Sequence, residues 1–480
     1  MLRQARLRIA NLKGWPAIAA KLEHFSSVLE IEIPGLDFPD INSEELQGAQ
    51  ESERYSIKQF STAFLTMMRR SNSSDSSLSS SSLKSSTSLS SVDSNDGLYS
   101  GDKDYVMVIG GCGYIGSHTA LELLKDGYNV IVVDDLSNSY ESVLDKVRTL
   151  AKKYHSEAGS KTPSLSFHKL DYRSPLMRSV LGRYTVRDPG SAALSHIKGV
   201  IHFAAYKSVE ESIHRPLDYY RNNVCGLVEL LVLLGDFGIN NFVFSSSATV
   251  YGSKANEGEP LHEEHLIHHP EEMDQSPTKA PAIPGAKGLT SPYGRTKYFS
   301  EAILADVAQA NPSWRITALR YFNPVGSEPF LGEDPRQQAT NLFPVIAQVL
   351  TGARPTLDVF GSDWDTRDGT ATRDFIHVVD LARGHLAALS TALDRPQAFR
   401  AYNLGTGNGC TVAEVVRSME NAAGRSIPVR WVDRRLGDVG YCVAATDRAA
   451  EELGWKTAKS LSQCAEDAWR SLQLSGRFAG

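Results

Sequence analysis

Short apolar runs alternate with longer amphipathic stretches from about residue 104 onward. The runs occupy residues 105–109, 130–133, 166–170, 199–203, 241–244 and 315–319. Runs this short and this apolar are typical of strands that are buried on both faces of a parallel sheet. The stretches between them are long enough to hold the helices that connect parallel strands. The pattern therefore predicts an α/β fold with a Rossmann-type doubly wound parallel sheet.

Glycines mark the place where the first run ends. They stand at 110, 111, 113 and 116, and beyond them Leu121 and Leu124 have helical spacing, so we expect a helix after Gly116. The Gly-x-Gly-x-x-Gly spacing from Gly111 to Gly116 permits a tight turn and a close approach of the backbone to a pyrophosphate. The N-terminus of the following helix offers free N–H groups and the positive end of a dipole. We therefore expect this turn to bind the phosphates of a dinucleotide.

An acidic residue ends the second apolar run. Asp134 stands at about the distance from the glycines that is expected of an acid holding the adenosine ribose hydroxyls. Leu136 follows, and no arginine lies nearby in the sequence to receive a 2′-phosphate. The sequence therefore favours NAD over NADP as the cofactor.

Polar residues follow four of the other runs, and they are Asp171, Lys207, Ser247 and Asn323. In open α/β sheets, ligands bind beyond the carboxyl ends of the strands. These four side chains are therefore candidate contacts of a bound ligand.

Tyr293 and Lys297 are the candidates for chemistry. They are four residues apart, so on a helix that begins near Pro292 they lie on one face, one turn apart. A tyrosine has an ordinary pKa near 10 and is a poor base at neutral pH. A nearby lysine ammonium and the positive charge of an oxidised nicotinamide would both favour the phenolate. We therefore expect Tyr293 to be the proton-abstracting base, with Ser247 relaying its proton.

Composition and charge narrow the class of protein. The chain has 480 residues, of which 41% are hydrophobic and 22% charged, as in ordinary globular proteins. A net charge of -6 argues against nucleic acid as a partner. No apolar run approaches the roughly 20 residues that cross a bilayer, so no membrane is expected. The five cysteines are scattered and none has Cys-x-x-Cys spacing, which indicates a reducing, cytoplasmic location without disulfides.

Five segments resemble motifs of the extended short-chain dehydrogenase/reductase family. They are Gly-Gly-Cys-Gly-Tyr-Ile-Gly-Ser-His-Thr (110–119), Ser-Ser-Ser-Ala-Thr-Val-Tyr-Gly (245–252), Ser-Pro-Tyr-Gly-Arg-Thr-Lys (291–297), Arg-Tyr-Phe-Asn-Pro-Val-Gly (320–326) and Thr-Arg-Asp-Phe-Ile-His-Val (372–378). Within that family, the combination resembles the nucleotide-sugar 4-epimerases that act on UDP-glucose and UDP-galactose. The resemblance covers about residues 104–474.

The resemblance implies an isomerisation that needs NAD but causes no net oxidation. Tyr293 would remove the proton of the sugar 4-hydroxyl while a hydride passes from carbon 4 to NAD+. The resulting 4-keto sugar would turn within the site and take the hydride back on its other face. NAD must therefore stay bound, a UDP-sugar is the expected partner, and the family suggests a homodimer.

The resemblance also assigns residues to each ligand. The implied NAD contacts are Gly110, Gly113, Tyr114, Ile115, Gly116, Asp134, Asn138, Asp171, Tyr172, Phe203, Ala204, Lys207, Asn222, Tyr293, Lys297 and Phe322. The implied substrate contacts are Lys207, Ser247, Tyr293, Asn323, Asn341, Leu342, Phe360, Arg373, Arg435, Asp438 and Cys442. An arginine suits a diphosphate because its guanidinium is a planar fork of donors.

Cys442 bears on which sugars the site accepts. At the matching position, family members restricted to UDP-glucose and UDP-galactose often carry a tyrosine, and those that also accept N-acetylated sugars carry a smaller residue. An acetamido group sweeps out extra space when the sugar turns, and a cysteine leaves that space open. The resemblance therefore implies that N-acetylated UDP-sugars are further substrates, although Cys442 could also be simply a small buried residue.

We expect three regions along the chain. Residues 1–103 form a largely disordered extension with a Ser-rich linker at 71–94, since such a tract buries too little apolar surface to offset chain entropy. Its first 21 residues are basic and could be a mitochondrial presequence, but acids follow closely. Residues 104–325 form the NAD-binding domain. Residues 326–480 mainly bind the UDP-sugar, with some segments returning to the sheet.

The segment at about 253–290 is longer than the family pattern. It holds histidines at 262, 265, 268 and 269 among acidic residues, which could suggest a metal. Their spacing matches no helical or zinc-finger ligand pattern, so we expect a solvated loop insertion and no metal site.

Two other functions compete with this interpretation. A nucleotide-sugar 4,6-dehydratase needs an Asp-Glu pair after the serine, but Ala248 and Thr249 stand there. A non-catalytic NAD-sensing protein of the same fold could lose the tyrosine or the lysine, whereas this chain keeps both.

Overall fold

The computed structural model describes residues 104–186, 194–269, 288–332, 339, 341–395, 397–435 and 438–475. The expected disordered extension and its Ser-rich linker lie outside the described residues, as does the middle of the insertion, residues 270–287.

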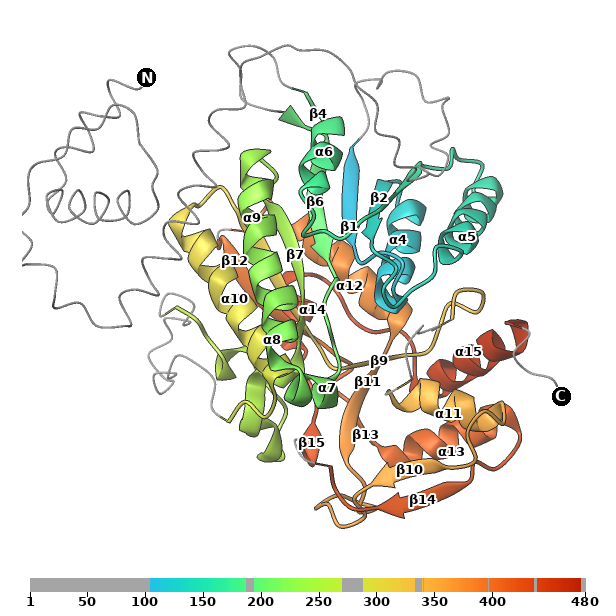
Figure 1. Ribbon diagram of the computed structural model, residues 1–480. Coiled ribbons are helices and arrows are strands. Elements are labelled where there is room, and N and C mark those ends of the chain that lie inside the picture. The colour runs from blue at the N-terminus through green and yellow to red at the C-terminus, as the bar shows by residue number, and fades with distance from the viewer. Residues whose placement is uncertain are drawn as a thin grey trace, which may run out of the picture. The chain divides into compact units, whose positions relative to one another are not determined.

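A seven-stranded parallel sheet forms the centre of the structure (Figure 1). In spatial order its strands are β12 (Phe399–Leu404), β8 (Arg315–Tyr321), β7 (Asn241–Ser247), β6 (Ile197–His202), β1 (Tyr105–Ile109), β2 (Asn129–Asp134) and β3 (Leu165–Lys169). The predicted fold class is confirmed. The six predicted strands are present with ends shifted by up to three residues, and β12 is a seventh that the pattern did not single out.

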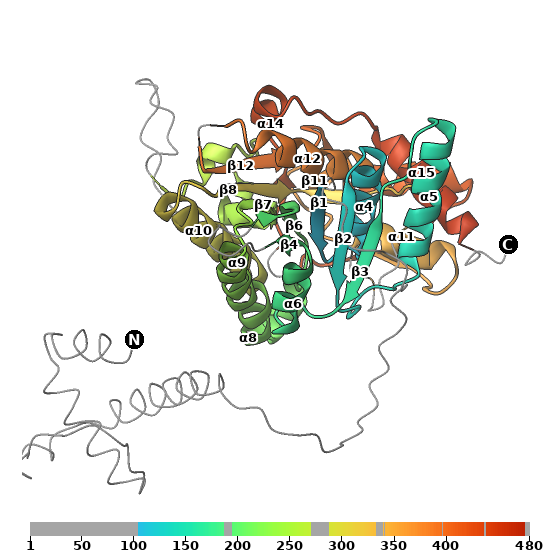
Figure 2. The ribbon, with the colours of Figure 1, turned by 90° about the horizontal axis from the view of Figure 1, so that it is seen from above.

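Helices cover both faces of this sheet (Figure 2). They are α4 (Tyr114–Lys125), α5 (Val143–Glu157), α6 (Leu176–Arg183), α7 (Val209–His214), α8 (Pro216–Tyr219), η1 (Tyr220–Cys225), α9 (Gly226–Asp236), α10 (Pro292–Ala310) and α12 (Val378–Thr391). Helix α4 begins at Tyr114, three residues before the predicted start, because its first turn forms within the glycine loop.

Alternate residues of each central strand face opposite layers of helices. Met107 and Ile109 of β1 pack in one apolar cluster with residues of α6, α9 and α10. Val106 and Val108 pack in a second cluster with residues of α4, α5 and α12. All four side chains are at most 1% exposed, which explains why the strand is a continuous apolar run rather than an alternating one.

Smaller elements of the C-terminal part gather beyond one end of the sheet (Figure 1). They are β9 (Asn323–Val325), α11 (Leu342–Leu350), β10 (Leu357–Phe360), β11 (Thr372–His377), β13 (Gly409–Thr411), α13 (Val412–Ala423), β14 (Val429–Val432), β15 (Tyr441–Cys442) and α15 (Leu461–Leu474). Helix α14 (Asp447–Glu452) lies beside β12 of the central sheet instead. Strand β9 follows directly from the carboxyl end of β8 and pairs with β11. The remaining short elements are β4 (Thr185–Val186), β5 (Leu194–Ser195), η2 (Ala248–Asn256) and η3 (Glu263–His265).

Buried histidines predict how stability depends on pH. His118, His202 and His385 are at most 2% exposed. Burial lowers the pKa of His118 and His385 to about 4 and that of His202 to about 3, from an ordinary 6.5. Between pH 6.5 and about 4 the unfolded chain therefore binds protons that the native chain does not. Each such histidine should lower the free energy of unfolding by about 1.4 kcal/mol per pH unit over that range.

We expect the thermal midpoint to fall steeply from pH 6.5 to pH 5, as measured by scanning calorimetry. The ring of His202 lies among Tyr172, Phe242 and Phe244, so leucine is an apolar replacement there. His202→Leu should make the fall shallower, whereas the same change at the exposed His214 should not. Equal slopes for the two variants would contradict this account.

Candidate active site

A cavity of about 340 Å³ lies at the carboxyl ends of the central strands. Its wall contains every residue that was predicted to contact NAD: Gly110, Gly113, Tyr114, Ile115, Gly116, Asp134, Asn138, Asp171, Tyr172, Phe203, Ala204, Lys207, Asn222, Tyr293, Lys297 and Phe322. It also contains four predicted substrate contacts, Lys207, Ser247, Tyr293 and Asn341. The residues predicted from the pattern and from the resemblance thus line one cavity, although they come from segments that are far apart in the chain.

The glycine loop is shaped so that only glycine fits at two of its positions. Gly110 has a φ of +82°, and a Cβ there would lie 2.8 Å from the backbone N of Ala204. A Cβ on Gly116 would lie 2.2 Å from the carbonyl oxygen of Gly110. Helix α4 therefore starts in direct contact with the turn, and no side chain caps its first N–H groups. Uncapped amides of this kind, in the wall of a cavity, fit a pyrophosphate.

Asp134 ties the glycine loop to the end of β2. Its Oδ2 accepts a hydrogen bond from the backbone N–H of Cys112 at 2.9 Å. Its Oδ1 accepts from the Leu136 N–H and the Ser139 hydroxyl, each at 2.9 Å. Burial raises the pKa of Asp134, and these three donors oppose that rise. The carboxylate therefore shapes the loop, a role that the sequence did not indicate beside the predicted contact with ribose.

Asp171 has a partner that the sequence analysis missed. Its carboxylate accepts from the guanidinium of Arg173 at 2.6 to 3.0 Å. Although burial alone would raise it, the pKa of Asp171 is lowered by these bonds. Asp171 is thus held in the cavity wall by its neighbour two residues on.

Ser247, Tyr293 and Lys297 meet in the cavity wall. Ser247 ends β7, and Tyr293 lies in the first turn of α10, where the Ser291 hydroxyl accepts from the Gly294 N–H at 3.1 Å and caps the helix. The Ser247 and Tyr293 side chains are hydrogen-bonded to each other. The ammonium of Lys297 lies 6.0 Å from the centre of the Tyr293 ring and donates to the Ser245 carbonyl.

Thr249 orients the hydroxyl of Ser247. The Ser247 Oγ accepts from the Thr249 N–H at 3.3 Å and from the Thr249 hydroxyl at 3.1 Å. With both bonds accepted, Ser247 has its own proton left to donate to the oxygen of Tyr293, which favours the phenolate. The sequence analysis noted Thr249 only as the absence of an acid, and missed this contact.

The chain's own residues alone do not give Tyr293 the low pKa that was expected from Lys297 together with an oxidised nicotinamide. Burial raises the pKa of Tyr293 to about 12, and the Ser247 hydrogen bond only partly opposes it. Burial also lowers the pKa of Lys297 to about 7, against the opposing influence of Glu301. The prediction counted charges but did not include the loss of water around both groups.

A buried ion pair lies behind these residues. Glu301 is one turn beyond Lys297 on α10, and its Oε2 is 2.8 Å from Nη2 of Arg320 at the end of β8, with both side chains fully buried. Burial alone would raise the pKa of Glu301, but Arg320 and His268 lower it to about 2. Ser246 also hydrogen-bonds this carboxylate. The spacing from Tyr293 through Lys297 to Glu301 is a regular four residues, which is the signal that could have found it.

The start of the insertion is buried, so its description as a solvated loop is wrong for residues 261–269. Leu261, Glu263 and Leu266 are at most 3% exposed, and the His268 side chain is 3% exposed at 3.1 Å from Glu301. A segment whose regular structure is the single turn η3 has no periodicity to mark its burial in the sequence, although its isolated apolar residues are a weak signal.

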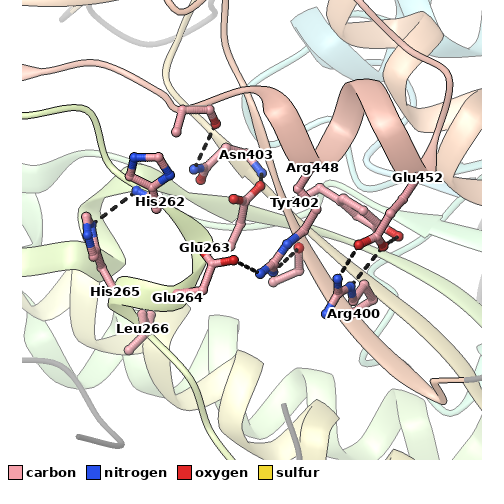
Figure 3. Close-up of polar contacts among 12 residues, drawn as sticks. His262, Glu263, Glu264, His265, Leu266, Arg400, Tyr402, Asn403, Arg448 and Glu452 are labelled. Carbon is pink, nitrogen blue, oxygen red and sulfur yellow. Dashed lines mark hydrogen bonds and ion pairs between the residues drawn. The ribbon is translucent and has the colours of Figure 1, made fainter. Parts of the chain in front are cut away.

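Polar contacts fix this segment to the C-terminal part (Figure 3). Glu263 accepts from the backbone N–H of Asn403 at 2.7 Å, and Glu264 pairs with Arg448 at 2.5 Å (Figure 3). His262 and His265 hydrogen-bond each other's backbone at the ends of η3, which is a capping role. Among the described residues, no three histidine, cysteine, aspartate or glutamate side chains are grouped as a metal site.

The other predicted substrate contacts form a second group outside the cavity wall. Arg373 and Cys442 are paired residues of β11 and β15. Arg435 lies with its guanidinium carbon 4.2 Å from the centre of the Phe360 ring and donates to Asp438 at 3.0 Å. Burial lowers the pKa of Arg373, whose guanidinium is largely enclosed by protein.

Three residues link this group to the cavity. Cys442 packs in one apolar cluster with Phe322 of the cavity wall and Ala248, the residue after Ser247. Asn323 pairs with Phe375 on β11, two residues beyond Arg373. Leu342 begins α11, directly after Asn341 of the cavity wall. The two groups therefore form neighbouring parts of one site.

Comparisons with known proteins agree with this geometry. The NAD dependent epimerase/dehydratase family matches residues 106–405. The chain is 42% identical over 370 residues to UDP-glucose 4-epimerase 2 of Arabidopsis thaliana, which covers 76% of this chain and 93% of that protein.

Solved structures of UDP-glucose 4-epimerases are also similar to this chain. The UDP-glucose-4-epimerase of Stenotrophomonas maltophila, with bound NAD and formylated UDP-arabinopyranose, has a TM-score of 0.66 and 37% identity, over 78% of this chain and 99% of that one. The UDP-glucose 4-epimerase of Bifidobacterium longum, in complex with NAD+ and UDP, has a TM-score of 0.64 and 38% identity, over 78% and 98%.

Proposed function

The chain belongs to the NAD-dependent epimerase/dehydratase family, and we propose that it interconverts UDP-glucose and UDP-galactose by inverting carbon 4 of the sugar. It is an isomerase that uses NAD. The observation that carries this proposal is the hydrogen-bonded pair of Ser247 and Tyr293, which lies in the wall of the cavity formed by the glycine loop.

The cavity offers the donors and shape that NAD needs. The uncapped amides of α4 suit the pyrophosphate, and Asp134 lies where the adenosine ribose is expected. When bound, NAD supplies reversible acceptance of the hydride from sugar carbon 4 and a positive charge near the Tyr293 hydroxyl. Tyr293 and Lys297 line the same cavity, so the reacting end of the cofactor belongs beside them.

The chain's own residues handle the proton. Tyr293 takes the proton of the sugar 4-hydroxyl, and Ser247 stabilises the phenolate by donating to its oxygen. Lys297 holds its ammonium behind them, bonded to the Ser245 carbonyl. The same tyrosine returns the proton after the keto sugar has turned, so no residue is used up in the cycle.

The second group of residues holds the nucleotide. Arg373 and Arg435 provide guanidinium forks for the diphosphate, and Phe360 provides an aromatic face for the uracil. The guanidinium of Arg435 lies over the Phe360 ring and pairs with Asp438, so the group proposed for the diphosphate is next to the ring proposed for the uracil. Asn341 and Leu342, at the start of α11, complete the approach from the cavity wall to this group.

The rival reaction lacks a residue that it requires. A 4,6-dehydratase needs acids after the serine, but Ala248 is buried and Thr249 hydrogen-bonds Ser247. Neither side chain can protonate a leaving hydroxyl at neutral pH. A purely NAD-sensing role would not require the hydrogen-bonded Ser247 and Tyr293 pair.

The proposed function is tested by incubating the purified chain with UDP-galactose and separating the products. We expect UDP-glucose to form without added oxidant or reductant, and NAD to be recovered from the denatured protein. A chain that contains NAD but forms a 4-keto-6-deoxy sugar would establish the dehydratase instead. Absence of any sugar conversion by NAD-loaded protein would exclude both reactions.

The range of sugars is predicted by Cys442. Cys442 is 9% exposed and belongs to the same apolar cluster as Phe322 of the cavity wall, so a tyrosine at this position would need space beside the cavity. We expect the wild type to act also on UDP-N-acetylgalactosamine. Cys442→Tyr should retain activity on UDP-galactose and lose at least 10-fold on the acetylated sugar, as measured by kcat/KM.

Cys442→Ala is the matched control, because it changes the side chain without filling the space. It should keep both activities within a few-fold of the wild type. A wild type without activity on UDP-N-acetylgalactosamine would contradict the prediction.

The proposal includes a cytoplasmic homodimer. Exposed apolar side chains lie on α8, α9 and α10, namely Leu217, Val228, Val232 and Phe299. The ring centres of Phe299 on α10 and Tyr220 on η1 are 6.2 Å apart, and α8, α9 and α10 all contact η1, so these elements are neighbours. Among the described residues, no helix is both long and apolar enough to cross a membrane. Sedimentation of the purified chain would test the dimer.

A further inference from the structure

One wall of the cofactor cavity is made by the loop of residues 326–332. This loop follows β9, and its residues Leu331 and Gly332 line the cavity. Leu331 is 3% exposed and belongs to the same apolar cluster as Cys112 of the glycine loop. The position of residues 326–332 therefore decides how well this side of the cavity is enclosed.

Two side chains of α4 hold this loop. The Tyr114 hydroxyl donates to the carbonyl oxygen of Gly326 at 2.6 Å. The backbone N–H of Glu328 donates to Nε2 of His118 at 3.0 Å. Tyr114 and His118 are one helical turn apart, and their rings meet edge to face at 5.3 Å. The helix that begins at the glycine loop is thus bonded at two points to the opposite wall of the cavity.

The partners of His118 determine its protonation. Nε2 faces an N–H group, which can only donate, so Nε2 must be the unprotonated nitrogen. Nδ1 lies 2.7 Å from the Tyr114 carbonyl oxygen, which can only accept, so Nδ1 carries the proton. The ring is 1% exposed, and burial lowers its pKa to about 4. His118 therefore makes both bonds only as one neutral tautomer, which suits a fixed structural connection.

We propose that His118 is a positioning residue for cofactor retention, which holds residues 326–332 against the NAD cavity through the backbone of Glu328. This inference rests on the proposed function, because only an enzyme that returns the hydride from the same cofactor molecule needs to keep NAD through many turnovers. His118 is not part of the cavity wall and makes its contribution through the loop.

The test measures loss of NAD rather than activity. Full-length protein is loaded with NAD, freed of excess cofactor, and mixed with ethanol and alcohol dehydrogenase, which reduce any released NAD to NADH and report it by absorbance. His118→Leu removes both hydrogen bonds but keeps an apolar side chain. We expect this variant to release NAD about 10-fold faster, the equivalent of about 1.4 kcal/mol. His118→Gln can still accept from Glu328, so its release rate should lie near that of the wild type.

A second measurement reports on the hydrogen bond between His118 and the loop of residues 326–332. Amide hydrogen exchange of residues 326–332 should be faster in His118→Leu than in the wild type. At saturating external NAD its kcat should remain within about threefold, because His118 touches none of the reacting groups. His155→Leu is the matched control, since His155 is a buried histidine on α5 that also makes two hydrogen bonds, to Leu124 and Ser160.

The outcomes separate the two proposals. A folded His118→Leu variant with unchanged NAD release overturns the retention role, as does an equal effect of His155→Leu. If His118→Leu does not fold, Tyr114→Phe removes the other bond to the loop, and unchanged release and unchanged exchange in that variant overturn the proposal. A wild type that holds NAD but does not convert UDP-galactose contradicts the proposed function and leaves the retention measurement valid.

Discussion

Replacing Tyr293 by phenylalanine should lower the turnover of UDP-galactose by about 1000-fold or more while the chain keeps its NAD. The change removes one oxygen and keeps the ring, so the packing at the start of α10 is preserved. General-base groups of this kind contribute about 100-fold to 10,000-fold to rate. The upper part of that range applies because the neighbouring hydroxyl, Ser247, is already committed to Thr249 and cannot easily replace the missing base.

Turnover is measured by separating UDP-glucose from UDP-galactose, and bound NAD by its absorbance after denaturation. Tyr298→Phe is the matched control, since Tyr298 lies on the same helix with its ring beside His268 and outside the cavity wall. That variant should retain most of its turnover. Turnover within 10-fold of the wild type in Tyr293→Phe would show that another group is the base.

Local patterns predicted the parts of this site that depend on a few neighbouring residues. The turn at Gly110 to Gly116 is one such part, because its tight backbone contacts admit only glycine at positions 110 and 116. The pair of Tyr293 and Lys297 is another, because a spacing of four places two side chains on one face of a helix. Strand ends were predicted to within three residues for the same reason, since apolar runs end where the sheet ends.

The residues that the sequence did not reveal act through segments far apart in the chain. Glu301, Arg320 and His268 come from a helix, a strand and the insertion, and only folding brings them together. A charged residue in a sequence is expected at the surface, so nothing local indicates that Arg320 is fully buried. The buried start of the insertion, residues 261–269, was missed because the residues that bury it are also far away in the sequence.

The pKa of Tyr293 shows a different limit. The sequence predicted that the Lys297 ammonium would favour the phenolate of Tyr293, but the influences on Tyr293 in the chain alone are burial and the hydrogen bond of Ser247. In the chain alone, burial disfavours the charged form of both groups. It raises the pKa of Tyr293 to about 12 and lowers that of Lys297 to about 7. Dehydration depends on everything that packs around a group, which no spacing rule contains.

Replacing Lys297 by methionine should lower kcat/KM by about 100-fold at pH 7 and move the pH optimum upward. Methionine keeps much of the length of the side chain and removes the ammonium that favours the phenolate. Without that cation, formation of the phenolate depends on a hydroxyl whose pKa burial raises to about 12. The activity of the variant should therefore fall furthest below that of the wild type at pH 7 and below, where Lys297 carries its charge, and should approach it as the pH rises to 10.

The same variant should not be less stable than the wild type at neutral pH. Burial lowers the pKa of Lys297 from 10.5 to about 7, so keeping the ammonium buried costs the native state a few kcal/mol at pH 7 and below. This cost shrinks as the pH rises from 7 to 10.5, because the lysine is then neutral in the native state but still charged in the unfolded one. The lost bond to the Ser245 carbonyl offsets part of the gain by about 1–3 kcal/mol.

Two measurements decide the role of Lys297, the pH profile of kcat/KM and the thermal midpoint at pH 7 and at pH 10. We expect a less active variant whose midpoint, relative to the wild type, is higher at pH 7 than at pH 10. Lys297→Arg is the matched control, because it keeps a positive charge at every pH and should not show the upward shift of the optimum. A low activity with an unchanged pH profile in Lys297→Met would mean that the lysine only fills space, since a purely steric role does not alter the protonation of Tyr293.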